Sequence, residues 1–500
     1  MGEMRPQGSA DVFCHFHGTF IRSVQRNVCR TYSFFERGVV IEHCGYFGDY
    51  DMEKRIPRLL ISGTNSGCGK TTIFCAVLQA LKNRRLNVAA FKCGPDYIDP
   101  MFHAAIMLAS SCNLDPYFCE EWLPYVMAEN AGEINLAEGA MGYYDGMAFT
   151  SKYSAYDVAC RLNLPTVLVI DAKGSANSVL AIMQGFLNFQ EKSGICGFIL
   201  NRVTERTYKG ICENWKDERA KLYGYFPALP EKYILKSRHL GLVTAGEIVC
   251  IREMMQYLAE QAEKTIDLDG LLALAQSAEP FRYNVPKISR MDPIRIAVAK
   301  DEALCFYYKE NLTLLQKMGA DIVDFSPLHD CELPKADCIY LGGGYPELYA
   351  DALSCNESMK ESLRKAAQDR IPIFAECGGF MYLNRMLDGK SMAGVLSGEC
   401  TNKNKPVRFG YIELEAKQDC LIAKKGDKLR AHEFHYYDCT QNGNAFSAKR
   451  RDKAYDCGVA DKYLYAGFPH IHFFSNLHCA EQFYRQCLKR KRERNETDGN

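Results

Sequence analysis

The sequence has no run of about 18 uncharged apolar residues, no Cys-x-x-Cys pair, no internal repeat and no excess of one charge. Because the apolar run is missing, we expect no membrane-spanning helix. Because paired cysteines are missing, a zinc ribbon or an iron–sulfur centre has no support. Lys and Arg number 61, and Asp and Glu also number 61, so the zero net charge argues against a general nucleic-acid-binding protein.

The N-terminus lacks the apolar core of a secretory signal. The 23 cysteines are scattered through otherwise globular sequence, so we expect reduced thiols in a cytoplasmic protein. Residues 1–51 show no helix or strand period, and the Cys14-His15-Phe16-His17 cluster within them is spaced too tightly to support a metal site. Met52 stands directly before the first predicted strand, and we hypothesise that it is the true start of the protein.

The chain of 500 residues, 47% of them hydrophobic and 24% charged, is long enough for two to four globular domains. Strands that alternate with helical patterns before and after a proline-containing stretch predict two α/β domains joined by a linker. The predicted divisions are an N-terminal extension (1–55, either disordered or a wrongly assigned start), a P-loop domain (56–278), a linker (279–293), a second α/β domain (294–485) and a basic, polar tail (486–500).

A phosphate-binding loop is the strongest motif in the first half. The apolar residues 59–61 predict a buried strand, a Gly-rich turn follows, and residues 72–81 have the period of an amphipathic helix. Backbone N–H groups of such a loop and the positive end of the helix bind phosphates, while Lys70 and the Thr71 hydroxyl would serve the terminal phosphates and Mg²⁺. Five residues separate Gly63 from Gly69, one more than is usual, and this longer loop resembles that of dethiobiotin synthetase. A Gly-rich turn without a ligand is the alternative.

Carboxylates follow two further predicted strands. Asp96 and Asp99 lie between two prolines after the strand 87–91, so they form a rigid loop at the end of a parallel sheet where ligands bind. The alternative is that both are turn formers and helix caps. Glu138 follows the strand 134–136, a position suited to a Mg²⁺ ligand or to a group that orients water. Further apolar strands at 165–171 and 197–201 complete a doubly wound sheet.

The second half carries a nucleophile motif. Cys377 stands between a predicted strand, 372–375, and a helix, with glycines after it, which is typical of a nucleophile elbow. Backbone N–H groups and the helix dipole favour thiolate there, so we expect the pKa of Cys377 to fall below its usual value of about 8.5. Gly343 and Gly378 are candidates for an oxyanion hole, and His470 is the candidate base. A buried structural thiol is the alternative. Other elements predicted in this half are strands at 295–299, 321–325 and 338–341 and a helix at 308–318.

Two patterns are weaker than they look. His432 and His435 are three residues apart, whereas the histidines of a metalloprotease zinc helix are four apart, so we expect no zinc there. A structural or substrate-contacting role for this segment stays open. The basic run 489–492 is interpreted as the solvated end of a helix rather than as a nucleic-acid site.

The motifs together resemble the cobyrinic acid a,c-diamide synthase family over about residues 56–485. The resemblance depends on the loop 63–72, on residues 92–103, on 113–116 and 138–146, and in the second half on residues 341–347 and 375–382. It implies a dethiobiotin-synthetase-like P-loop domain followed by a class I glutamine amidotransferase domain. The implied reaction is ATP- and Mg²⁺-dependent amidation of the a and c carboxylates of cobyrinic acid with ammonia from glutamine, through acyl phosphates.

The resemblance also assigns roles to single residues. Cys377 attacks glutamine and His470 activates it, while His472 stands where many class I enzymes have Glu. Asp96, Glu138 and Thr71 are candidate Mg²⁺ ligands, Asn201 a candidate contact of adenine, and Tyr97, Asp99 and Asp145 candidates for the substrate and phosphoryl pocket. Arg202, Arg238 and His239 are candidate contacts for the many substrate carboxylates. The implied nucleotide-binding loop consists of Gly63, Thr64, Asn65, Ser66, Gly67, Cys68, Gly69, Lys70, Thr71 and Thr72.

Alternatives stay open at this point. The same chemistry on nickel-sirohydrochlorin or hydrogenobyrinic acid is the nearest one, and a partitioning-type P-loop ATPase or binding protein with an inactive amidotransferase domain is a more distant one. We expect cobyrinic acid and glutamine as small-molecule partners, no nucleic acid and no membrane. A homodimer, the order of the two amidations and the route of ammonia stay undecided.

Overall fold

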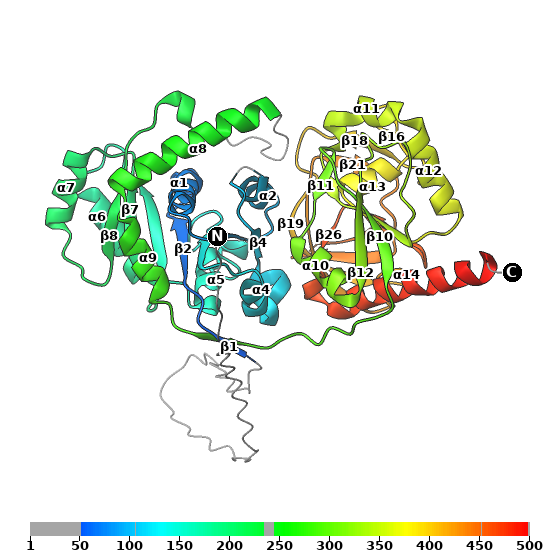
Figure 1. The fold of residues 1–500 in the computed structure, drawn as a ribbon, viewed down its shortest axis with the longest axis horizontal. Coiled ribbons are helices and arrows are strands. Elements are labelled where there is room, and N and C mark those ends of the chain that lie inside the picture. The colour runs from blue at the N-terminus through cyan, green and yellow to red at the C-terminus, as the bar shows by residue number, and fades with distance from the viewer. Residues whose placement is uncertain (1–51, 106, 235–244, 452, 499–500) are drawn as a thin grey trace, which may run out of the picture. The chain divides into compact units, whose positions relative to one another are not determined.

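The computed structural model describes residues 52–105, 107–234, 245–451 and 453–498 (Figure 1). All of them belong to one compact unit, residues 50–500. The expectations for residues 1–51, for Arg238 and for His239 therefore lie outside the described residues.

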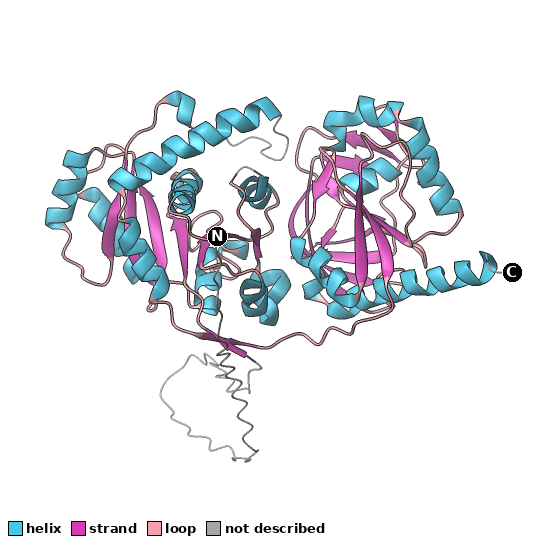
Figure 2. Cartoon of the chain, viewed as in Figure 1, coloured by secondary structure: helices cyan, strands magenta, loops and turns pink. Residues whose placement is uncertain are grey.

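A parallel sheet of seven strands organises the first half, with helices packed around it (Figure 2). The strand order is β4-β3-β5-β2-β6-β7-β8, and every neighbouring pair is parallel. The strands are β2 (Arg58–Gly63), β3 (Val88–Cys93), β4 (Ser111–Leu114), β5 (Ile134–Glu138), β6 (Thr166–Asp171), β7 (Ile195–Asn201) and β8 (Lys221–Phe226). The helices are α1 (Lys70–Asn83), α2 (Ile98–Ala105), α3 (Pro116–Cys119), α4 (Leu123–Glu129), α5 (Ala155–Leu162), α6 (Ser178–Asn188), α7 (Glu205–Asn214), α8 (Ala245–Thr265) and α9 (Leu268–Gln276).

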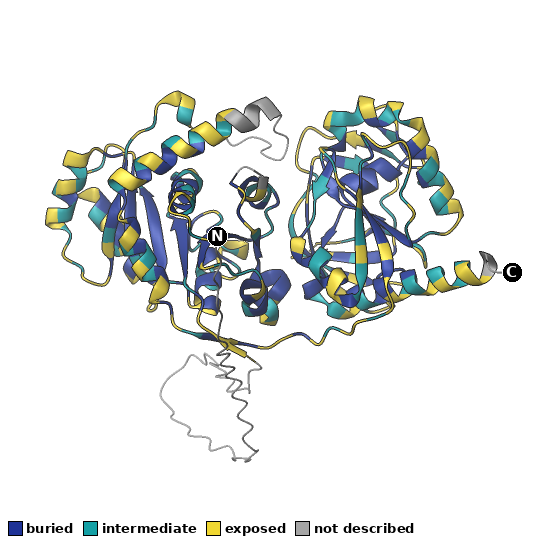
Figure 3. Cartoon of the chain, in the orientation of Figure 1, coloured by how far each residue is buried: buried dark blue, intermediate teal, exposed yellow. Residues whose placement is uncertain are grey.

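Both faces of this sheet are covered by apolar side chains, as expected of a parallel sheet. All six residues of β2 are buried. In Figure 3, buried residues are dark blue, and this colour dominates the strands of the sheet. Leu59 and Ile61 enter one apolar cluster, and Leu60, which points to the opposite face, enters another. Strands β2, β3 and β5 are fully buried, and the predicted site residues Gly63, Glu138 and Asn201 stand at the carboxyl ends of β2, β5 and β7.

A second parallel sheet organises the other half, in the order β12-β10-β13-β15-β25-β24, with only the edge strand β24 antiparallel. An antiparallel sheet, β23-β22-β19-β20-β26, and a small sheet, β17-β16-β18-β21, are added to it. The strands are β10 (Ile294–Ala299), β11 (Leu304–Phe306), β12 (Ala320–Phe325), β13 (Cys338–Leu341), β14 (Gly343–Gly344), β15 (Ile373–Glu376), β16 (Met386–Leu387), β17 (Lys390–Ser391), β18 (Glu399–Asn402), β19 (Arg408–Ala416), β20 (Lys428–His435), β21 (Tyr437–Cys439), β22 (Phe446–Arg450), β23 (Lys453–Cys457), β24 (Val459–Ala460), β25 (Leu464–Gly467) and β26 (His470–Ile471). The helices are α10 (Lys309–Met318), α11 (Ala350–Cys355), α12 (Glu357–Gln368), α13 (Gly378–Leu383) and α14 (Leu477–Asp498).

The predicted α/β fold class is confirmed, and each predicted parallel strand coincides with one in the structure. The antiparallel strands β19 to β23 were not predicted. Two of the predicted domain divisions fall within regular structure. β9 (Phe281–Tyr283) lies inside the predicted linker and pairs with β1 (Met52–Lys54). The division at 485 falls inside α14, whose Arg494 and Lys491 pair with Asp337.

Within the described residues, no helix is long and apolar enough to cross a membrane. Every cysteine in the part of the chain that the structure describes is free.

Candidate active site

The phosphate loop connects β2 to α1, and a distant strand shapes it. Gly67 and Gly69 have φ values of 83° and 94°, in the region that favours glycine. A Cβ on Gly69 would lie 2.0 Å from the side-chain nitrogen of Asn201, and that nitrogen donates a hydrogen bond of 2.8 Å to the Cys68 carbonyl. Asn201 at the end of β7 thus fixes the backbone of the loop at Cys68 and Gly69. Its predicted contact with adenine stays a prediction.

Charged and polar groups gather where β2, β3 and β5 end. The Thr71 hydroxyl donates to Glu138 Oε1 at 2.5 Å, Lys92 Nζ lies 3.1 Å from the same oxygen, and Lys92 also pairs with Asp99. Burial raises the pKa of Glu138, and the Lys92 ammonium opposes this. Burial also acts on Asp99, but Lys92 holds the pKa of that carboxyl below its usual value. The structure brings Thr71, Glu138 and Asp99 together around one buried ammonium group.

The polar groups around Glu138 fit a Mg²⁺ ion whose remaining ligands would be phosphate oxygens of a bound nucleotide. The second carboxylate oxygen of Glu138, Oε2, is buried and has no hydrogen-bond partner among the described residues. Asp96 Oδ1 accepts from the backbone N–H groups of Ile98 and Asp99 at 2.8 and 3.2 Å. Within the described ranges, no three His, Cys, Asp or Glu side chains form a complete metal site. A site with one or two carboxylates, a hydroxyl and substrate phosphates is what Mg²⁺ prefers.

His103 on α2 is a neighbour of Glu138 that sequence reasoning did not assign a role. Its ring is fully buried, and Nε2 lies 3.6 Å from Glu138 Oε2. Neither atom has a hydrogen-bond partner in the part of the chain that the structure describes. Burial lowers the pKa of His103 to about 3, so the ring is neutral at pH 7. A neutral imidazole that carries its hydrogen on Nε2 would face that oxygen. The signal in the sequence was a histidine on the apolar face of a helix that follows the Asp96 loop.

The loop that carries Asp145 lies against the phosphate loop. The Tyr143 N–H donates to the Gly63 carbonyl at 2.8 Å, and a Cβ on Gly142 would lie 2.7 Å from the Thr64 carbonyl oxygen. Asp145 itself is exposed, and its Oδ2 accepts from the Gly142 N–H at 3.0 Å. Asp145 therefore stands at the rim of the nucleotide loop.

In the second half, Cys377 occupies the predicted elbow. It lies between β15 and α13 with φ 43° and ψ −100°, a combination that is strained for a residue with a side chain. Its N–H donates to the Gly467 carbonyl at 2.7 Å, and the residue is 7% exposed. Backbone strain held in this way at a strand-to-helix turn is the geometry of a presented nucleophile.

The two candidate oxyanion glycines and the histidine lie together. A Cβ on Gly343 would lie 2.4 Å from His470 Cε1, and a Cβ on Gly378 would lie 3.2 Å from the Gly343 carbonyl carbon. Glu376, the residue before Cys377, accepts from the N–H of Ile471, the residue after His470, at 2.6 Å. The elbow and the histidine strand are thus fastened to each other by a buried hydrogen bond.

The electrostatics of this pair differ from the expectation. Burial raises the pKa of Cys377, and the carboxylates of Glu347, Glu376 and Glu433 raise it further. Burial, together with His432 and His435, lowers the pKa of His470 well below its usual value. The expectation of a lowered thiol pKa was therefore wrong, because desolvation outweighs the short helix α13. Both pKa shifts favour the neutral forms, a thiol at Cys377 and an uncharged imidazole at His470.

Comparison with known proteins identifies both domains. Residues 59–240 match the CobQ/CobB/MinD/ParA nucleotide binding domain, and residues 295–477 match the CobB/CobQ-like glutamine amidotransferase domain. The cobyrinate a,c-diamide synthase of Clostridium acetobutylicum is 37% identical over 431 residues, which cover 84% of this chain and 98% of the relative. That of Caldanaerobacter subterraneus subsp. tengcongensis is 37% identical over 445 residues (86% and 98%), and that of Listeria monocytogenes 36% over 446 residues (84% and 97%). The chain belongs to the cobyrinate a,c-diamide synthase family.

Membership in the cobyrinate a,c-diamide synthase family confirms the resemblance drawn from the motifs and leaves one departure from other class I enzymes to explain. His472, which stands where many have Glu, is fully buried, stacks on Phe118 at 5.3 Å and contacts Tyr308 at 4.7 Å. Its Nδ1 accepts from the Phe474 N–H at 3.3 Å. His472 thus packs against the first half of the chain and takes no part in orienting His470 by a hydrogen bond.

His432 and His435 lie on strand β20, not on a helix, and both are buried. The ring of His432 stacks on His470 at 5.1 Å, and His435 Nδ1 lies 2.6 Å from the Tyr437 carbonyl. The segment of β20 that contains His432 and His435 therefore packs beside His470 of the thiol site. The sequence alone had left the role of this segment open.

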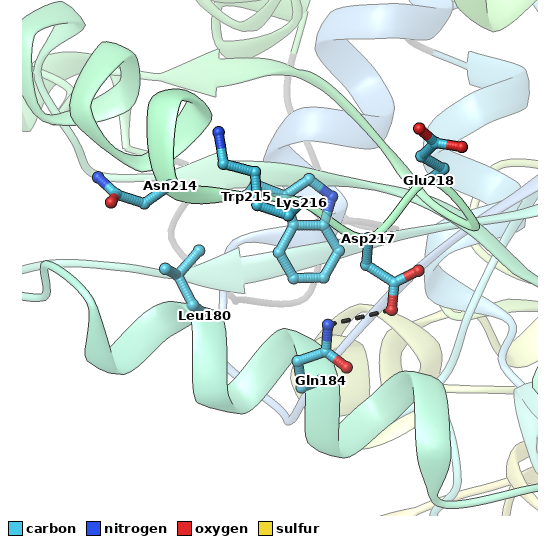
Figure 4. Close-up of a pocket in the computed structure, with 7 residues that line it drawn as sticks. All are labelled: Leu180, Gln184, Asn214, Trp215, Lys216, Asp217 and Glu218. Carbon is cyan, nitrogen blue, oxygen red and sulfur yellow. Dashed lines mark hydrogen bonds between the residues drawn. The ribbon is translucent and has the colours of Figure 1, made fainter.

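Two remaining features lie away from both sites. Arg202 forms an exposed ion pair with Asp171, so its predicted contact with substrate carboxylates stays a prediction. A hollow of about 640 Å³ opens between α6 and the segment that follows α7 (Figure 4). None of the predicted site residues lines it. Its lining consists of Leu180, Gln184, Asn214, Trp215, Lys216, Asp217 and Glu218.

Proposed function

We propose that this protein is a glutamine-dependent amide ligase that uses ATP to convert the a and c carboxylates of cobyrinic acid into amides. The observation that carries the proposal is that one chain, which covers 96–98% of the length of its named relatives, contains both a P-loop and a strained Cys377, whose strand is joined to that of His470 by the hydrogen bond between Glu376 and Ile471. An inactive amidotransferase domain would have no reason to keep the strained elbow.

The first step makes a carboxylate electrophilic. A carboxylate oxygen of the corrin attacks the terminal phosphorus of ATP, the bond to the bridging oxygen breaks, and ADP leaves with the electron pair. Lys70 and the loop N–H groups neutralise charge on the phosphates. Thr71, Glu138 and Asp96 would hold Mg²⁺, which supplies further neutralisation of the phosphoryl group when it is bound. Asp99, Asp145 and the adenine contact of Asn201 belong to this same proposed pocket.

The second step supplies nitrogen. His470 takes the proton of Cys377 as the sulfur attacks the side-chain amide carbon of glutamine. The N–H groups of Gly343 and Gly378 stabilise the oxyanion, and the protonated His470 gives its proton to the leaving ammonia. Water then hydrolyses the glutamyl thioester. Ammonia attacks the acyl phosphate and phosphate leaves, so ammonia must reach the first site unprotonated, through a path that contains little water.

Mass spectrometry of the corrin product tests the proposal. The protein is incubated with glutamine, ATP and Mg²⁺ and with cobyrinic acid, hydrogenobyrinic acid or nickel-sirohydrochlorin in separate reactions. We expect two carboxyl-to-amide conversions on cobyrinic acid. Conversion of only one of the other acceptors would move the assignment to that tetrapyrrole, and ATP consumption without any amide would favour the ATPase alternative.

Cys377→Ala separates the two steps. We expect it to lose amidation with glutamine and to keep amidation with ammonium salts, because exogenous ammonia needs only the first site. Lys70→Ala, the matched variant of the other site, should lose amidation with both nitrogen sources. If Cys377→Ala still uses glutamine, the nucleophile is another residue.

A further inference from the structure

An aromatic side chain from the nucleotide half contacts the histidine of the thiol site. Tyr97 lies in the loop between β3 and α2 and is 8% exposed. Its ring stacks on Phe306 at 5.1 Å with an interplanar angle of 5°, and its centroid lies 4.7 Å from that of Tyr308 and 5.2 Å from that of His470. The family resemblance implies a place for Tyr97 in the substrate and phosphoryl pocket, but the ring of Tyr97 contacts Phe306, Tyr308 and His470 of the glutamine-hydrolysing half.

The imidazole of His470 depends on packing for its orientation. Its Nδ1 is buried and has no hydrogen-bond partner among the described residues. In many catalytic pairs, a third group fixes the base by a hydrogen bond to that second nitrogen. Here the ring is held by contacts alone, with Gly343 beside Cε1 and the rings of His432 and Tyr97 at 5.1 and 5.2 Å.

The loop that carries Tyr97 is itself rigid and is joined to the phosphate site. The Asn113 side-chain nitrogen donates to the carbonyls of Gly94 and Asp96 at 2.8 and 2.6 Å. Two residues after Tyr97, Asp99 pairs with Lys92, which also lies 3.1 Å from Glu138. Phosphates bound beside these groups would compete with the two carboxylates for the Lys92 ammonium and so act on the loop.

We propose that Tyr97 is a positioning residue of the glutamine-hydrolysing site, supplied by the nucleotide half, and that it sets the orientation of His470. The inference rests on the proposed function for the roles of Cys377 and His470, but not on the identity of the acceptor. The glutamine site is then complete only when the Asp96–Asp99 loop is in place. Ligands that bind at Lys92 and Glu138 change the rate of glutamine hydrolysis through this ring.

The test uses glutamine hydrolysis by the full chain, measured as glutamate release without ATP or corrin, so that acceptor binding has no influence. For Tyr97→Leu we expect kcat to fall between about ten- and about a hundred-fold, since displacement of a catalytic group by about 1 Å has effects of this size. The KM for glutamine should stay within about two-fold, because the base is displaced and not the binding groups. Tyr97→Phe keeps the ring and should retain wild-type kcat. Tyr97→Met, which keeps volume without a ring, replaces the Leu variant if that variant does not fold.

Tyr117→Leu is the matched control. Tyr117 is also 8% exposed, and it stacks on Tyr411 of the second half at 4.3 Å, but it has no ring contact with His470. Loss of kcat in this control equal to that of Tyr97→Leu, or equal loss in Tyr97→Phe, would overturn the proposal, as would wild-type kcat in Tyr97→Leu. A second readout is the rate at which iodoacetamide alkylates Cys377, which should fall in Tyr97→Leu alone. A wild-type protein that hydrolyses glutamine but amidates no corrin would contradict the proposed function and leave the role of Tyr97 standing.

Discussion

Replacement of Gly343 by Ala is the sharpest test of where His470 lies. The backbone at Gly343 does not have the positive φ that would itself strain an alanine. The added methyl would lie 2.4 Å from His470 Cε1 and 3.2 Å from the Cβ of Phe306. Since ordinary contact begins at 3.4 Å, the histidine must move by 3.4 − 2.4 = 1.0 Å.

A displacement of that size at a catalytic base reduces kcat by about 100-fold, which corresponds to about 2.7 kcal/mol in the activation free energy. The assay compares amidation of cobyrinic acid with glutamine and with ammonium chloride. We expect the glutamine rate of Gly343→Ala to fall by that factor and the ammonium rate to be retained, because Gly343 belongs to the thiol site alone.

Gly185→Ala is the control, since a Cβ at that position of α6 meets no heavy atom within 4 Å. Overpacking at Gly343 is also expected to lower the unfolding free energy by about 1–3 kcal/mol, so the thermal midpoint of each variant is measured first. A folded Gly343→Ala protein that uses glutamine at the wild-type rate would show that His470 is not the base, or that it does not lie against Gly343.

Three further predictions concern single side chains. Lys70→Ala should keep glutamine hydrolysis while losing all ATP-dependent amidation, which a glutamate-release assay and product mass spectrometry together would show. His103→Phe removes the nitrogen that faces Glu138, so the Mg²⁺ concentration for half-maximal amidation should rise about tenfold. For His103→Gln, this concentration should stay closer to that of the wild type. An unchanged Mg²⁺ dependence in His103→Phe would argue against the role of His103. Burial raises the pKa of Glu376 to about 8 from 4.5, so its contribution to stability is present below pH 4.5 and is lost as the pH rises through 8. Glu376→Gln should therefore flatten the decrease of the unfolding free energy over that range in urea titrations, and a slope equal to that of the wild type would contradict the buried position of this carboxyl group.

The structure explains why some features were predictable and others were not. The strands predicted at 59–61 and 372–375, which correspond to β2 and β15, could be predicted because strands buried on both faces consist of consecutive apolar residues. The Cys377 elbow was predictable because the glycines after it are local in sequence. The thiol pKa was predicted in the wrong direction, because it is raised by burial and by the charges of Glu347 and Glu433, and both burial and these neighbours are set by the fold.

The amino-acid sequence by itself determined the two chemistries, since a P-loop and a glycine-flanked cysteine are defined by short stretches whose backbone geometry depends on neighbouring residues. Only the tertiary structure decided how the nucleotide site and the thiol site are connected. Tyr97 and His470 are 373 positions apart in the chain, yet their rings lie 5.2 Å from each other. Contacts of this kind arise when whole sheets and helices pack together, and no local pattern encodes them.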